Sequence, residues 1–181
     1  MSEIQVYTIF NNILQSCTYI LTKQNEGDAY LVDCGNIDPI ISYIEKNNLH
    51  LEGVLLTHCH YDHIYGLKAL LMQYPNIKIY AGEKTFLGLA DDDLNMSYLY
   101  EDEEYTVCLS AEQINVIRDN YNPIILGEQL KCIPTPGHDV DCMSFLLGNA
   151  IFTGDSYNPN SPVFTKWHNS DFEEAISNEC L

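Results

Sequence analysis

Residues 58 to 63 read His-Cys-His-Tyr-Asp-His and hold three of the six histidines of this 181-residue chain. They come directly after the apolar run Val54 to Thr57, so a strand is expected to deliver them. Chance would produce three histidines and an aspartate in this pattern in roughly one chain in a few thousand. A polar surface loop is the alternative, but the density of imidazole and carboxylate groups favours a metal site.

The spacing of these groups indicates how they could bind cations. In an extended segment alternate residues project to the same side, so His58 and His60 can face one cation while Cys59 points away. If the chain then turns into a helix, Asp62 and His63 face a different position. The pattern therefore favours two adjacent metal ions over one. Imidazole and carboxylate ligands without an obligatory thiolate suit zinc, and also iron or manganese.

Three further candidates, each a few residues after another apolar segment, are Asp33, His138 and Asp155. Taken singly, each could be an ordinary turn residue, and for Asp33 that structural explanation is the stronger one. In α/β proteins, however, sites form outside the carboxyl ends of strands. We therefore expect these three side chains to gather with residues 58–63, because liganding groups cluster.

Alternating strands and helices are predicted along the rest of the chain, which indicates an α/β fold built from strand-helix-strand units. One helix is expected to begin with Asp38 as its N-cap, and another to run from Ile64 until Pro75 stops it. Residues 82–105 are predicted to form a short helix and a long loop, and residues 110–116 fit a helix start or a strand equally well. A last helix is expected to begin at residues 170–171. One strand is expected to start at Gly53, and the other expected strands are residues 6–10, 18–22, 29–32, 77–80, 130–133, 143–147 and 150–152.

Length and charge restrict the possible functions. The chain is long enough for one sizeable core and no linker divides it, so residues 1–181 are predicted to form a single domain. The formal charge of −18 argues against nucleic acid and an anionic membrane surface as partners, because both attract clustered Lys and Arg. The seven cysteines lack a disulfide-framework spacing, and no signal peptide or membrane span is recognisable. We therefore expect a cytoplasmic protein that acts on a small molecule.

Four segments together resemble the metallo-β-lactamase superfamily of metallohydrolases, and in particular the hydroxyacylglutathione hydrolases. The segments occur in the family's order and span most of the chain: Leu31 to Gly35, Thr57 to His63, Thr135 to His138, and Phe152 to Asp155. The resemblance implies a four-layer αββα sandwich with two metal ions at one edge, and a single metallo-hydrolase domain.

The resemblance also implies roles for the candidate residues. The second metal would be held by Asp62 and His63, with Asp155 bridging the two ions. Asp33 would be a supporting carboxylate that orients the loop, and we assign Asp62 and Asp33 as the catalytic carboxylates. The first metal would be held by His58, His60 and His138.

Two features depart from the family pattern. Tyr65-Gly66 stands where the family usually has Gly-Gly soon after the histidine cluster. The sequence also stops inside an expected helix, before the position of a further family histidine. The C-terminus is therefore expected to be incomplete, and the alternative is that the second metal is weakly held. His168 is the last histidine of the chain, and it is expected to be a surface residue rather than a substitute ligand.

The predicted chemistry is hydrolysis by a metal-bound hydroxide, because two adjacent cations lower the pKa of bound water and polarise a carbonyl. The expected substrate is a small ester, thioester or lactone. An alternative in another reaction class is a mononuclear iron sulfur dioxygenase, since some family members use a similar frame. A non-catalytic, vestigial metal-binding domain is the third possibility.

Overall fold

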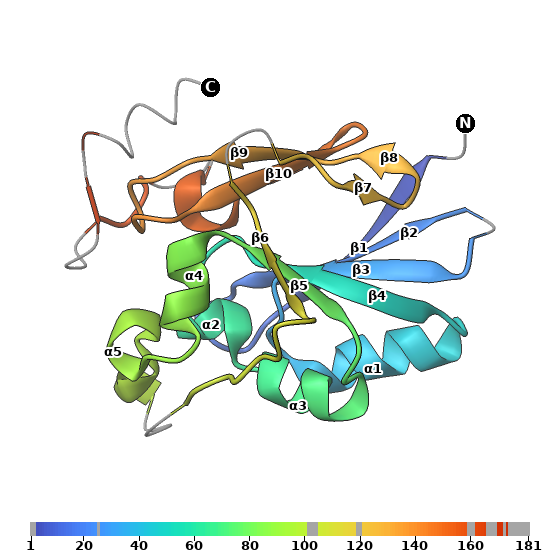
Figure 1. The fold of residues 1–181 in the computed structure, drawn as a ribbon, viewed down its shortest axis with the longest axis horizontal. Coiled ribbons are helices and arrows are strands. Elements are labelled where there is room, and N and C mark those ends of the chain that lie inside the picture. The colour runs from blue at the N-terminus through green and yellow to red at the C-terminus, as the bar shows by residue number, and fades with distance from the viewer. Residues whose placement is uncertain are drawn as a thin grey trace.

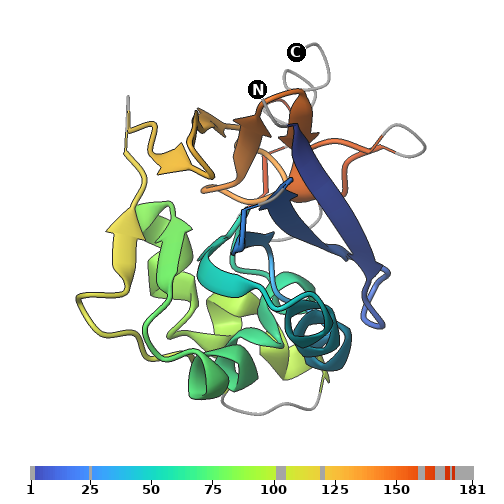
Figure 2. The same ribbon diagram turned by 90° about the vertical axis from the view of Figure 1, so that its right-hand side faces the viewer.

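The computed structural model describes residues 3–24, 26–100, 105–118, 121–158, 162–165, 170–171 and 173. Its centre is a six-stranded sheet, with helices on one face and a three-stranded sheet on the other (Figure 1, Figure 2). The central sheet has the order β1 (Ile4–Phe10), β2 (Cys17–Lys23), β3 (Asp28–Val32), β4 (His50–Leu55), β5 (Lys78–Ala81), β6 (Ile114–Val116).

The second sheet has the order β11 (Ala150–Phe152), β10 (Met143–Leu147), β9 (Lys131–Pro134), and a short ribbon, β7 (Ile124–Ile125) with β8 (Glu128–Gln129), precedes it along the chain. No described helix is long and apolar enough to cross a bilayer. The α-helices are α1 (Ile37–Lys46), α2 (Tyr61–Ile64), α3 (Leu67–Gln73), α4 (Glu83–Gly88) and α5 (Asp92–Asn95), and 3-10 turns cover Ser97–Tyr100 and Gly154–Ser156.

Strand directions follow from the connections. Strands β1, β2 and β3 pair antiparallel, whereas β3, β4, β5 and β6 pair parallel. Helix α1 joins β3 to β4, and helices α2 and α3 join β4 to β5, so the predicted strand-helix-strand units are present. As a result, the carboxyl ends of β3 and β4 lie at the same edge of the sheet, where the candidate residues follow them.

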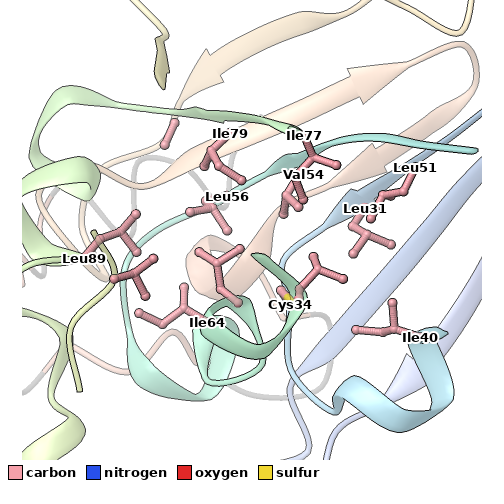
Figure 3. Packing of buried hydrophobic residues seen from close by; sticks show 14 of the residues in the cluster. Leu31, Cys34, Ile40, Leu51, Val54, Leu56, Ile64, Ile77, Ile79 and Leu89 are labelled. Carbon is pink, nitrogen blue, oxygen red and sulfur yellow. The ribbon is translucent and has the colours of Figure 1, made fainter. Parts of the chain in front are cut away.

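The central sheet is buried on both faces because its strands alternate between two apolar cores. Leu31 and Val54 belong to the core beneath the helices, together with Ile40 and Ile64 (Figure 3). The next residues along these strands, Val32 and Leu55, point the other way and pack with side chains of the second sheet, among them Phe145, Leu147 and Phe152. This period-two pattern fixes the strand register, since a shift of one residue would exchange the two cores.

The α/β class is confirmed, and three successive layers, helices, sheet and sheet, lie in the described part of the chain. The strands predicted at residues 143–147 and 150–152 are present as β10 and β11, and they pair antiparallel about the turn at Gly148 and Asn149. The helix predicted from residues 170–171 onward lies outside the described residues, apart from residues 170, 171 and 173.

Helix α1 begins earlier than predicted. Its N-cap is Asn36 rather than Asp38, which lies in the first turn. The side chain of Asn36 does not cap the helix, because its oxygen accepts a hydrogen bond from the Tyr65 hydroxyl while its backbone N–H donates to Asn11. Residues 110–116 were predicted to be either a helix start or a strand. In the structure Ser110 and Gln113 form a hydrogen-bonded turn, and the strand Ile114–Val116 follows it.

The helix predicted from Ile64 to Tyr74 is divided at Gly66, where α2 ends and α3 begins. Gly66 donates its N–H to the Cys34 carbonyl oxygen, and Cys34 in turn donates to the carbonyl oxygen of His63. A Cβ atom on Gly66 would lie 2.0 Å from the carbonyl oxygen of Gly35. Only a glycine therefore allows the backbone after β3 to touch the turn that carries His63.

Replacement of Gly66 by alanine should lower the free energy of unfolding by about 2 kcal/mol, because the added methyl group must push two backbone segments apart. Gly27→Ala is the matched control, since a Cβ atom there meets nothing within 4 Å. Urea denaturation followed by circular dichroism measures both. Equal stabilities of the two variants would contradict this account of the close approach.

Candidate metal centre

Four chain segments converge at one edge of the central sheet. Asp33 follows β3 and residues 58–63 follow β4, while His138 and Asp155 follow β9 and β11 of the second sheet. The Nε2 atom of His138 lies 2.9 Å from Nδ1 of His60, and Oδ1 of Asp155 lies 3.2 Å from Nε2 of His63. The expected gathering of these side chains is therefore present in the structure.

The side-chain atoms that could ligate a metal form two groups, and His58 belongs to both. In the first, one ring nitrogen from each of His58, His60 and His138 lies within 4.8 Å of the others. In the second, ligand atoms of His58, His63 and Asp155 satisfy the same limit, and Oδ2 of Asp62 lies 3.3 Å from Nε2 of His63. All six side chains predicted to bind metal thus lie in one cluster, and the two groups within it are adjacent.

The outer nitrogen of each imidazole has an acceptor on the protein. Nδ1 of His63 lies 2.8 Å from Oδ2 of Asp33, and Nδ1 of His138 lies 2.7 Å from the carbonyl oxygen of Phe164. A carboxylate or a carbonyl oxygen can only accept, so both Nδ1 atoms carry the proton. In a neutral ring the lone pair is then on Nε2, which faces the centre of the cluster.

The carboxylate of Asp33 holds Thr57 and His63 in place through hydrogen bonds. Its Oδ1 accepts the N–H of Thr57 at 2.8 Å, and its Oδ2 accepts the Thr57 hydroxyl at 2.8 Å as well as Nδ1–H of His63. Because the Thr57 hydroxyl donates to Asp33, its oxygen accepts from Nδ1 of His58 at 3.0 Å. Asp33 is 1% exposed and has φ of 58°, a left-handed conformation that aspartate tolerates better than most residues.

The surroundings of the His58 ring indicate whether the cluster suits a cation. Its ring is fully buried, and among the described residues its Nε2 atom has no hydrogen-bond partner. An unpaired buried polar atom is costly unless a ligand satisfies it. The Nε2 lone pair points into the space shared by both groups, which is the geometry expected of a metal ligand. The donor set of the cluster therefore fits a divalent cation.

The rings differ in their affinity for protons. Burial and the neighbouring imidazoles hold the pKa of His58 well below its usual value, and burial also lowers the pKa of His138. Burial alone would lower the pKa of His63 too, but the carboxylates of Asp155 and Asp33 raise it well above its usual value. Of these three imidazoles, His63 holds a proton most firmly.

The carboxylates of the cluster also differ in their pKa. Burial raises the pKa of Asp62, whereas that of Asp155 lies far below its usual range because the charge and hydrogen bond of His63 outweigh burial. Burial would raise the pKa of Asp139, but its interaction with His60 lowers it. The side chain of Asp155 is 43% exposed, so this carboxylate lies where the cluster meets solvent.

A small hollow of about 100 Å³ opens on the cluster between His60, Asp62, His138 and Asp155. The ring of Tyr100 stacks on Tyr61 with centroids 5.2 Å apart, and Tyr100 also lines the hollow. The apolar wall consists of Leu14, Tyr61, Met96, Tyr100 and Phe164.

A hollow of about 590 Å³ lies beside β6 and β9, lined by Arg118 and Cys132 among others. None of the clustered histidines lines this hollow, so the larger of the two hollows is not the one beside the candidate metal site. Cys59 points away from the imidazoles, as expected, and its Sγ lies 3.6 Å from the carbonyl oxygen of Leu94. His168, by contrast, lies outside the described residues.

Sequence reasoning missed three partners of the cluster: Thr57, the carbonyl of Phe164 and Asp139. Two of them offer a signal in the sequence, because Thr57 directly precedes His58 and His138 is directly followed by Asp139. The Oδ2 atom of Asp139 lies 3.4 Å from Nε2 of His60. A backbone carbonyl such as that of Phe164 leaves no trace in residue types.

Comparison with known proteins agrees with this geometry. Residues 12–178 match the family described as the metallo-beta-lactamase superfamily. The chain is 30% identical over 178 residues to a probable metallo-hydrolase, M6_Spy0554 of Streptococcus pyogenes, covering 96% of this chain and 75% of that protein. It is 29% identical over 139 residues to a hydroxyacylglutathione hydrolase of Pseudoalteromonas translucida, covering 76% of this chain and 45% of the relative. The chain thus spans less than half of that hydrolase.

Solved structures agree on the fold. The crystal structure of the BLEG-1 B3 metallo-beta-lactamase superposes with a TM-score of 0.85 at 22% identity, covering 96% of this chain and 83% of that one. The di-iron-bound form of TTHA1623 superposes with a TM-score of 0.75 at 18% identity, with the same two coverages. The predicted metallo-β-lactamase-like α/β fold is confirmed by these matches. With a family match over nearly its whole length and this arrangement of strands, the chain belongs to the metallo-β-lactamase superfamily.

Proposed function

We propose that this protein is a metal-dependent hydrolase of a small ester, thioester or lactone. The observation that carries the proposal is the buried Nε2 atom of His58, which has no hydrogen-bond partner in the described part of the chain and lies at the junction of two adjacent donor groups. A surface loop or a structural histidine cluster would leave no such atom aimed into a shared space. Two curated relatives are named hydroxyacylglutathione hydrolase and probable metallo-hydrolase, which supports the reaction class.

We assign the two donor groups to two cations. Imidazole and carboxylate donors make zinc the best fit, with iron or manganese as the next. Bound there, the cations would supply a water nucleophile at neutral pH and polarise the substrate carbonyl. The first would be held by His58, His60 and His138, and the second by Asp62 and His63, with Asp155 shared between them.

The chain's own residues then have separate tasks. Asp33, which we expected to be catalytic, is better described as a positioning residue, because it is buried and its oxygens face Thr57 and His63. Asp62 remains the proposed catalytic carboxylate, since it lines the hollow beside His63. The apolar wall of Leu14, Met96 and Phe164 suits a short acyl group.

A mononuclear iron sulfur dioxygenase is the second candidate. The observation in its favour is the donor set of the cluster, because imidazole and carboxylate ligands accept iron as well as zinc. Metal analysis of the purified protein separates the two candidates. One iron per chain, together with no hydrolysis of any ester or thioester, would favour the dioxygenase.

His58→Ala and Asp155→Ala should each lower kcat/KM for p-nitrophenyl acetate and for a simple acetyl thioester by more than about 100-fold, because even outer partners of metal ligands cost 10- to 100-fold. His50→Ala is the matched control, since the His50 side chain is 75% exposed and contacts Glu52. Steady-state hydrolysis in the presence of added zinc measures the effect. Absence of turnover in the unsubstituted protein would instead favour a non-catalytic metal-binding domain.

Zinc uptake by chelator-treated protein should release protons, and the apparent affinity should fall as the pH falls. The reason is the pKa of His63, which Asp155 and Asp33 raise well above its usual value, so the ring must lose a proton before it can ligate. Calorimetry in buffers of different ionisation enthalpy counts the protons. His63→Gln should release about one proton fewer per chain, whereas His50→Gln should release the same number as the unsubstituted protein.

A further inference from the structure

His60 is oriented opposite to the other three imidazoles of the cluster. His58, His63 and His138 each hold Nδ1 on a protein acceptor and present Nε2 to the centre. His60 instead presents Nδ1, which lies 2.9 Å from Nε2 of His138. Its Nε2 atom therefore faces outward, and the acceptor beside it is Oδ2 of Asp139 at 3.4 Å.

Asp139 is held firmly enough to orient a neighbour. Its Oδ1 accepts the N–H of Asp141 at 3.2 Å, and its backbone carbonyl oxygen accepts from Gly137 at 3.1 Å and from Cys142 at 3.4 Å. The carboxylate side chain is 5% exposed and that of His60 is 6% exposed. One oxygen of the carboxylate is thus fixed by the turn, which leaves the other directed at the imidazole.

We propose that Asp139 is a positioning residue that accepts Nε2–H of His60 and so places the Nδ1 lone pair of His60 toward His58 and His138. This inference rests on the proposed metal site and deepens it, because it names the group that completes the set of outer acceptors. Without that acceptor, His60 could rotate or carry its proton on Nδ1, which would block ligation. Outer acceptors of this kind typically alter metal affinity by about 10- to 100-fold.

Asp141 provides a matched control within the same turn. Its Oδ2 accepts the N–H of Thr85 at 2.7 Å, at the start of α4, and a Cβ atom on Gly82 would lie 2.2 Å from that oxygen. Asp141→Asn therefore removes the same charge two residues away but acts on α4. A purely electrostatic or structural effect of the turn should affect both variants alike.

The experiment compares Asp139→Asn and Asp141→Asn for zinc affinity, by competition with a chromophoric chelator, and for the visible absorption of the cobalt-substituted protein. Asp139→Asn should weaken the first zinc equivalent by about 10- to 100-fold and shift the cobalt bands. Asp141→Asn should leave both unchanged. Equal losses in the two variants, or no loss in either, would overturn the proposal, as would the absence of zinc binding in the unsubstituted protein.

Nitrogen-15 NMR of the zinc-loaded, unsubstituted protein gives a second test that needs no variant. His60 should carry its proton on Nε2, whereas His58, His63 and His138 should carry theirs on Nδ1. A His60 ring protonated on Nδ1 would refute the proposal. The proposed hydrolysis can fail separately: zinc binding with the expected tautomers and no ester or thioester turnover would reject the reaction and retain the role of Asp139.

Discussion

The buried carboxylate of Asp33 is the interaction on which the arrangement of the site depends. It binds the backbone and hydroxyl of Thr57 and the ring of His63, and through Thr57 it fixes the ring of His58. Thr57 also accepts the N–H of Met143 on its carbonyl oxygen at 2.8 Å, which ties the second sheet to the end of β4. One carboxylate therefore connects the ends of two parallel strands, two imidazoles and the neighbouring sheet. Its hydrogen bonds compensate for removing a charge from water.

The sheet architecture explains why residues so far apart in sequence meet. Parallel pairing of β3 with β4 places the residues after both strands at one edge, and the second sheet packs its apolar face against the same strands. His138 and Asp155 then enter from the ends of β9 and β11. The apolar alternation of Leu31 with Val32, and of Val54 with Leu55, fixes this arrangement, because it presents one core to the helices and the other to the second sheet.

Much of the fold and of the candidate site could be predicted from the sequence, because strand positions and motifs depend on local pattern. Strand positions follow from apolar runs, and the candidate donors stand at their ends in recognisable motifs. What could not be predicted depends on tertiary contacts. The division of the expected helix at Gly66 comes from contact with Gly35, and Asn36 is the N-cap although its side chain binds Tyr65. The partnership of His60 with Asp139 requires knowing which ring nitrogen faces inward, and residue types do not encode that orientation.

The origin of the donors in both sheets has a consequence for the order in which the protein matures. During synthesis, residues 58–63 leave the ribosome long before His138 and Asp155, so early intermediates contain only part of the donor set. Any cation that needs donors from both sheets is captured only after β9, β10 and β11 have packed onto the central sheet. Such capture favours the finished fold over its precursors, because a ligand that binds only the native state lowers the free energy of that state alone.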